Sequence, residues 1–161
     1  MTIKVGDRLP DATFKVNRGG DMVDVSVDEL TEGKKVVLFA VPGAFTPTCH
    51  AKHMPSYLQH YDELKAKGVD TIACVAVNDP FVLAEWEKTQ NCGDKIMLLS
   101  DGNAEFTKAI GLDFDGSGFK LGIRSMRYAM VVEDGVVKSL AVEEAPPMME
   151  VSGAEHILKA L

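Results

Sequence analysis

The residues best placed to do chemistry lie in the segment that ends at Cys49. This segment follows the apolar run at 36–41 and reads Pro-Gly-Ala-Phe-Thr-Pro-Thr-Cys over residues 42–49. Thr46 precedes a proline, so its backbone is extended and fits a helix N-cap, with Pro47 at the first helical position. Cys49 then lies in the first turn, where unpaired N–H groups and the helix dipole favour a thiolate. The pattern predicts a nucleophilic cysteine.

The neighbours of Cys49 strengthen this interpretation. The Thr46 hydroxyl can accept a hydrogen bond from the N–H of Cys49 and donate one to the sulfur or to a bound oxygen. Pro42 and Pro47 flank the loop and stiffen it. The alternative is that Cys49 is a small buried side chain that happens to follow a turn.

A metal site is a further alternative for the same segment. Cys49 and His53 are one helical turn apart, and His50 is adjacent. No third carboxylate or imidazole stands at a suitable spacing, so we expect no metal. The glycine-rich stretch at 116–118 lacks the lysine and the strand-loop-helix setting of a phosphate loop. We therefore interpret this stretch as a flexible rim.

The motif resembles that of a known family. Pro-x-x-x-Thr-x-x-Cys is similar to the peroxiredoxin active-site signature, and the full run at 42–49 resembles the peroxiredoxin-5 subfamily, which includes the plant type II peroxiredoxins. The likeness continues at 77–81, at Trp86 and at 124–129, so it covers nearly the whole chain. It implies a thioredoxin fold with an N-terminal extension and peroxide reduction without metal, flavin or haem.

The resemblance also implies roles for individual residues. Cys49 resembles the cysteine that attacks the peroxide, Thr46 the hydroxyl that orients it, Pro42 the residue that shields the site, and Arg127 the arginine that steadies the thiolate and the transition state. The chemistry agrees, because a permanent cation stabilises the charge that develops on the leaving oxygen. Taken alone, Arg127 is more simply a surface cation at a strand edge. Arg124 either supports the site or is solvated.

The two other cysteines are candidates for resolving the oxidised Cys49. Cys74 lies in a continuous apolar strand and reads as a small buried residue, although plant type II relatives have a cysteine at this place that is sometimes assigned as resolving. Cys92 lies in a polar loop, so we expect it to be exposed. The other type of the family that the motif resembles has a resolving cysteine near the C-terminus. The corresponding region here, 145–151, has none, and this departure favours a cycle completed by an outside thiol.

These observations predict a thiol-dependent peroxidase for hydrogen peroxide and alkyl hydroperoxides. We expect glutathione with glutaredoxin as reductant, and thioredoxin as the second choice. Phe119, Leu121 and Ile123 could line an apolar approach for organic peroxides. A thiol-disulfide exchange module is a rival, but position 52 is Lys52, so the Cys-x-x-Cys pair is missing. A redox sensor on the same fold is another.

The elements that must position these residues alternate between strand-like and helix-like segments. The sequence predicts an α/β thioredoxin-like fold, with an N-terminal strand extension, a central mixed sheet and one domain over 1–161. It predicts a helix over 47–67 that kinks at Pro55, and a helix that starts at Asp79-Pro80. An Asp-Gly hairpin turn follows at 133–135, and a capping box opens the last helix at Ser152.

Composition limits the partners and the location. The formal net charge of −7 over 161 residues argues against nucleic acid and anionic membranes as partners. No apolar run approaches the roughly 20 residues of a membrane span. The N-terminus has no signal-peptide pattern, so we expect a cytoplasmic location, or an organelle reached only through a presequence absent from these 161 residues. The subfamily resemblance implies a homodimer near the active-site face, using Phe45, Phe81 and Trp86.

Overall fold

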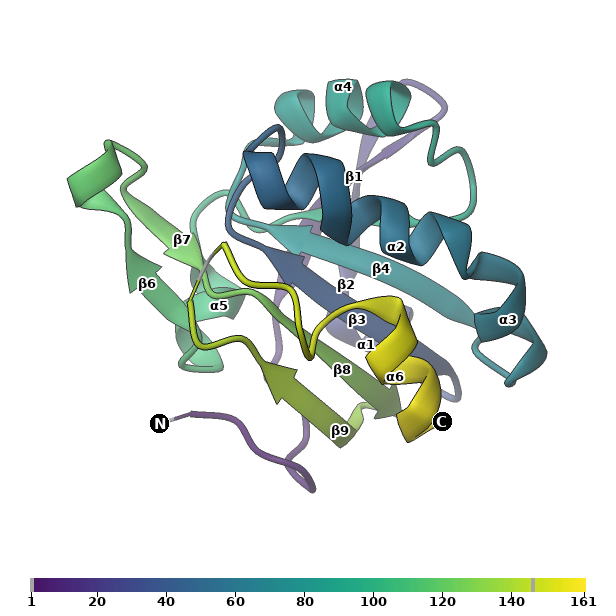
Figure 1. Cartoon of the computed structure of the whole chain (residues 1–161). Coiled ribbons are helices and arrows are strands. Elements are labelled where there is room, and N and C mark those ends of the chain that lie inside the picture. The colour runs from purple at the N-terminus through teal and green to yellow at the C-terminus, as the bar shows by residue number, and fades with distance from the viewer. Residues whose placement is uncertain (1, 146) are drawn as a thin grey trace.

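The computed structural model describes residues 2–145 and 147–161, and its centre is a seven-stranded mixed sheet with helices on both faces (Figure 1). The strand order is β2-β1-β5-β4-β3-β8-β9. These strands are β1 (Thr13–Arg18), β2 (Asp21–Ser26), β3 (Lys35–Val41), β4 (Thr71–Ala76), β5 (Met97–Ser100), β8 (Tyr128–Glu133) and β9 (Val136–Val142). A separate ribbon pairs β6 (Asp113–Asp115) with β7 (Ile123–Ser125). The helical elements are α1 (Val27–Thr31), η1 (Cys49–His53), α2 (Met54–Gln59), α3 (Tyr61–Ala66), α4 (Pro80–Gln90), α5 (Glu105–Ala109), η2 (Ser117–Phe119) and α6 (Ala154–Ala160).

Strand β3 lies inside the sheet and ends at the loop that carries Cys49. It pairs in parallel with β4 and antiparallel with β8. Every residue of β3 after Lys35 is buried, which explains its unbroken apolar sequence. The β8–β9 hairpin turns at Asp134 and Gly135, whose φ angles are both positive, at 48° and 81°. Two positive φ angles are what a two-residue Asp-Gly hairpin turn requires.

Each face of the sheet has its own apolar core. The core under α2, α4 and α6 contains Cys49, Trp86 and Ile157. The core on the opposite face contains Phe14 and Phe106, whose rings meet edge to face with centroids 5.2 Å apart. Cys49 therefore belongs to the core between the sheet and helices α2, α4 and α6.

The helix that follows the loop is divided, whereas the sequence predicted one kinked helix over 47–67. Its first turns widen into the π-helical η1, in which the N–H of Met54 donates to the carbonyl of Cys49. It then continues as α2 and, after a break, as α3. Pro55 supplies the physical reason, because it has no N–H and the wide turn directly before it absorbs the lost hydrogen bond. The distortion expected at Pro55 thus takes the form of a π turn that begins at Cys49.

The last helix starts differently from the prediction. Helix α6 has Gly153 as its N-cap, and the N–H of Ala154 in its first turn donates to the hydroxyl of Ser56 in α2 at 2.8 Å. The hydroxyl of Ser152, which the capping box assigned to this helix, donates instead to Glu143 at 2.6 Å. A hydrogen bond to Glu143, which is nine residues away, has replaced the expected bond to the first turn of the helix.

Two parts of the fold were not predicted. A capping box at Ser26 and Glu29 opens the short α1. The segment 111–126 contains the β6–η2–β7 ribbon, which projects from the sheet (Figure 1). Across the described residues, no helix combines the length and the apolar character needed to cross a bilayer.

Candidate active site

The loop after β3 is held in one conformation by hydrogen bonds. The N–H of Ala44 donates to the side-chain oxygen of Asn78 at 3.0 Å, and the Thr46 hydroxyl donates to the carbonyl of Gly43 at 2.6 Å. Phe45 has a φ of 65°, in the left-handed region that costs a non-glycine residue about 1–2 kcal/mol. Such a conformation persists only where its surroundings determine it, so this loop is pre-organised.

Cys49 lies in the first turn of the helix, as the sequence predicted, and its side chain is fully buried. Its sulfur accepts a hydrogen bond from Nη2 of Arg127 at 3.0 Å. The Thr46 hydroxyl was expected to bond the N–H of Cys49. It bonds Gly43 instead, because the tight turn at 43–46 folds that carbonyl back toward it.

Arg127 reaches the sulfur from a distant part of the chain. It directly precedes β8, and the pairing of β8 with β3 brings it to the end of the sheet where Cys49 lies. Only 2% of its surface is exposed, so it is not the surface cation of the alternative interpretation. Arg124 takes another position: its Nε donates to the carbonyl of Leu121, and its guanidinium lies against the loop at Gly43.

His53 is a site residue that sequence reasoning weighed only as a metal ligand. Its Nδ1 lies 2.8 Å from Nη1 of Arg127, and its Nε2 lies 3.0 Å from the carbonyl oxygen of Ser152. A guanidinium only donates and a carbonyl only accepts, so the imidazole carries its proton on Nε2. Burial, together with the positive charge of Arg127, lowers the pKa of His53 to about 3, so the ring is neutral. The sequence feature that could have indicated this role is the four-residue spacing between Cys49 and His53, which places both on one face of a helix.

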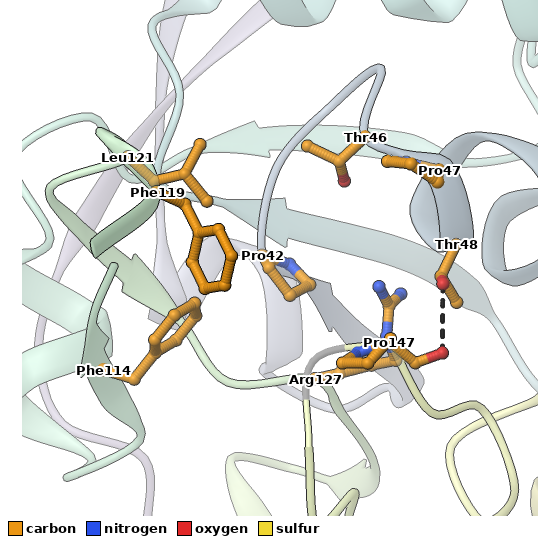
Figure 2. Close-up of a pocket in the computed structure, with 9 residues that line it drawn as sticks. All are labelled: Pro42, Thr46, Pro47, Thr48, Phe114, Phe119, Leu121, Arg127 and Pro147. Atoms are coloured by element: carbon orange, nitrogen blue, oxygen red, sulfur yellow. Dashed lines mark hydrogen bonds between the residues drawn. The ribbon is translucent and has the colours of Figure 1, made fainter. Parts of the chain in front are cut away.

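A largely apolar cavity of about 440 Å³ leads to this group (Figure 2). The side chains of Phe114, Phe119 and Leu121 come from the β6–β7 ribbon and face the loop across the cavity. The complete lining is Pro42, Thr46, Pro47, Thr48, Phe114, Phe119, Leu121, Arg127 and Pro147. Since Arg127 lines the cavity and also donates to the sulfur of Cys49, the cavity ends one hydrogen bond from this sulfur.

The other two thiols are buried in the same core as Cys49. Cys74 is on β4, and burial raises the pKa of its thiol well above the usual range. Cys92 was expected to be exposed, but it is fully buried. Asn91 adopts a left-handed conformation and turns the chain inward, so the sulfur of Cys92 lies 3.7 Å from that of Met54. Burial raises the pKa of Cys92 to about 12.

Comparison with known proteins agrees with this geometry. Residues 4–158 match the Redoxin family. The chain belongs to the peroxiredoxin family. It is 53% identical to peroxiredoxin-2E-2 of rice, with 99% of this chain and 73% of the rice protein covered. It is 50% identical to peroxiredoxin-2E of Arabidopsis thaliana, covering 99% and 70%. A reduced Prx3 of Vibrio vulnificus, solved in complex with hydrogen peroxide, has a TM-score of 0.92 and 55% identity, covering 99% and 96%.

These relatives confirm three predictions and overturn a fourth. The protein is a peroxiredoxin of the kind that the motif resembled, its fold is thioredoxin-like, and it is a thiol-dependent peroxidase. The expected cytoplasmic location is wrong, because the rice and Arabidopsis relatives are named as chloroplastic proteins. That prediction was based on the absence of a signal-peptide pattern at the N-terminus, and such an absence does not identify a location. Within 2–145 and 147–161, no group of three or more His, Cys, Asp or Glu side chains is arranged to hold a metal.

Proposed function

We propose that this peroxiredoxin reduces hydrogen peroxide and alkyl hydroperoxides through Cys49, with Thr46, Arg127 and Pro42 as the other active-site residues. The Cys49 thiolate attacks the terminal peroxide oxygen and forms an S–O bond as the O–O bond breaks. The sulfur is oxidised by two electrons to a sulfenic acid, and the leaving oxygen takes a proton from solvent and departs as water or alcohol. The hydroxyl of Thr46 orients the peroxide, and Pro42 shields the reacting atoms.

The observation that carries this proposal is the 3.0 Å hydrogen bond from Arg127 Nη2 to the sulfur, at the end of a cavity. A buried guanidinium keeps its charge at any working pH. It therefore faces the point at which negative charge builds up on the leaving oxygen, and a fixed donor in a water-poor site is most effective there.

The cavity lining supports organic hydroperoxides as substrates. Phe119 is 83% exposed, and such a large apolar side chain at the rim offers contact area to an alkyl or aryl group. Hydrogen peroxide has no such group. The lining therefore favours organic substrates, whereas the Arg127 and Thr46 polar groups serve both.

The positions of the thiols support an outside reductant. Cys74 and Cys92 are buried and their raised pKa values keep them protonated, which makes them poor attackers of a sulfenic acid. We propose that glutathione forms a mixed disulfide with Cys49, releasing water, and that glutaredoxin removes it. Thioredoxin is the second candidate.

A homodimer is part of the proposal. Phe45 is 46% exposed, and its ring lies 5.8 Å from that of His50 on the helix that carries Cys49; Phe81, in the first turn of α4, is 72% exposed. Exposed aromatic side chains are typical of an interaction surface, and we propose that both belong to the dimer face. Trp86, expected to share this face, is fully buried beside Phe45 and supports it from beneath.

Peroxide consumption by the reduced protein tests the proposal. Wild type and Cys49→Ser are assayed with glutathione and glutaredoxin, and separately with thioredoxin and its reductase. We expect turnover with the first system, slower turnover with the second and none for Cys49→Ser. Full turnover by Cys49→Ser would remove Cys49 from the reaction, and faster turnover with thioredoxin would reverse the choice of reductant.

A further inference from the structure

Glu143, which directly follows β9, is a buried carboxylate with an unusual set of donors. Only 4% of its surface is exposed. Its Oε2 accepts hydrogen bonds from three successive backbone N–H groups, those of Glu150, Val151 and Ser152, at 2.9, 2.9 and 2.7 Å. The hydroxyl of Ser152 adds a fourth at 2.6 Å. Successive N–H groups that converge on one oxygen form a nest for an anion.

The nest keeps Glu143 ionised. Burial alone would raise the pKa of this carboxyl, but the four hydrogen bonds from 150–152 outweigh burial and hold the pKa below its usual range. A carboxylate in this environment fixes the chain that surrounds it, because any displacement would leave a buried charge without donors.

The peptide group fixed in this way is the one that the active site uses. On one side, the N–H and the hydroxyl of Ser152 donate to Glu143. On the other, the carbonyl oxygen of Ser152 accepts from Nε2 of His53 at 3.0 Å and from the hydroxyl of Tyr57 at 2.6 Å. Ser152 is therefore held from both sides, and its carbonyl has a defined position.

From Ser152 the chain of hydrogen bonds runs to the nucleophile. Nδ1 of His53 accepts from Nη1 of Arg127 at 2.8 Å, and Nη2 of Arg127 reaches the sulfur of Cys49 at 3.0 Å. Glu143 also touches the arginine directly, because its own N–H donates to the backbone carbonyl of Arg127 at 2.9 Å. One residue thus fixes both the backbone and, through two intermediates, the guanidinium of Arg127.

We propose that Glu143 is a positioning residue for the peroxide step. Its carboxylate fixes the position of the Ser152 carbonyl. That carbonyl accepts from Nε2–H of His53 and so maintains the tautomer whose Nδ1 can accept from Arg127. The hydrogen bond to Nδ1 orients the guanidinium of Arg127 toward Cys49. This inference rests on the proposed function, since it gives Glu143 its effect through Arg127. No sequence pattern predicted this role, because the pattern at Ser152 indicated a helix cap.

Glu143→Gln tests the proposal, with Glu144→Gln as the matched control. Gln has the same shape but lacks the charge that attracts four donors. A misplacement of about 1 Å can lower a rate by about 100-fold, so we expect the second-order rate with hydrogen peroxide to fall by about 10- to 100-fold. We also expect the thiolate absorbance titration of Cys49 to move to higher pH. Glu144 is the exposed neighbour, and its variant should match wild type in both measurements.

A double-mutant cycle separates positioning from a merely structural role. If Glu143 acts through His53, Glu143→Gln should cost little in a His53→Leu background, where the connection is already broken. Full additivity of the two losses would overturn the proposal. So would a Glu143→Gln protein with a lower unfolding temperature but an unchanged rate and an unchanged thiolate titration.

A second variant keeps the test decisive. Should Glu143→Gln fail to fold, Ser152→Ala removes only the hydroxyl donor and leaves the backbone nest. We expect a smaller loss of rate and a smaller shift of the titration in the same direction, and no change in either would overturn the proposal. The outcome is separable from the proposed function, because Cys49→Ser tests that function in a protein whose Glu143 is intact.

Discussion

The buried imidazole of His53 makes the stability of this peroxiredoxin depend on pH. Its pKa is about 3 in the folded state, against 6.5 for an accessible imidazole. Below pH 6.5 the unfolded chain therefore binds a proton that the folded chain does not, so stability falls as the pH drops through the window from 6.5 to 3. Between pH 7 and pH 5, proton linkage gives a loss of about 2 kcal/mol from this group alone.

Urea unfolding at pH 7 and pH 5, followed by the fluorescence of Trp86, measures this loss. The matched variant is His53→Gln, whose amide can accept from Arg127 and donate to the Ser152 carbonyl but binds no proton in this range. With a slope of about 2 kcal/mol per molar urea, the wild-type midpoint should fall by about 1 M more than that of the variant. The other histidines and the carboxylates are shared by both proteins and cancel in the comparison.

Equal shifts of the two midpoints would refute this reasoning. They would mean that the folded protein protonates His53 as readily as the unfolded chain does. In that case the imidazole would not be the neutral acceptor for Arg127 that the geometry requires. Circular dichroism at pH 5 without urea provides the control, since both proteins must start from the folded state.

Three further predictions follow from the site. Arg127→Ala should slow the peroxide step by about 10² to 10³-fold, as for the loss of one pre-organised donor, and move the thiolate titration of Cys49 to higher pH; an unchanged titration would contradict this. Phe119→Ala should lower the rate with cumene hydroperoxide by about 10-fold and leave the rate with hydrogen peroxide intact; equal losses would argue against an apolar substrate contact. A Cys74→Ala, Cys92→Ala double variant should keep most of its turnover with glutathione and glutaredoxin; a dominant Cys49–Cys74 disulfide by mass spectrometry, with loss of turnover, would contradict a cycle that needs one cysteine.

The sequence was most informative where structure is local. The Thr46-Pro47 pair predicted the helix start and the place of Cys49 in its first turn, because proline restricts the residues on both sides of it. The Asp-Gly turn predicted the β8–β9 hairpin for a similar reason. Arg127 entered the candidate site only through resemblance, since a position 78 residues away reaches Cys49 only once β8 pairs with β3.

The errors arose where a tertiary contact overrode a local pattern. Polar neighbours predicted an exposed Cys92, but the left-handed Asn91 directs the thiol into the core. The Ser-x-x-Glu pattern at Ser152 predicted a capping box, but the hydroxyl bonds Glu143. Ser152 takes part in the site through its backbone carbonyl. Every residue has such a carbonyl, so the residue type at position 152 does not predict this role. His53 was missed for the same reason, because one of its two partners is that carbonyl.

The same contacts set a condition for the second half of the reaction. Cys49 is fully buried, so its sulfenic acid must move before an outside thiol can reach it. Four hydrogen bonds connect its helix to the C-terminal segment: from Thr48 to the Pro147 carbonyl, from His53 and Tyr57 to the Ser152 carbonyl, and from the N–H of Ala154 to the Ser56 hydroxyl. Breaking them costs about 1 kcal/mol each, so the open form is limited to roughly one molecule in 900. The hydrogen bonds that aim Arg127 at the sulfur therefore also slow its reduction, and we expect reduction by the outside thiol to limit turnover.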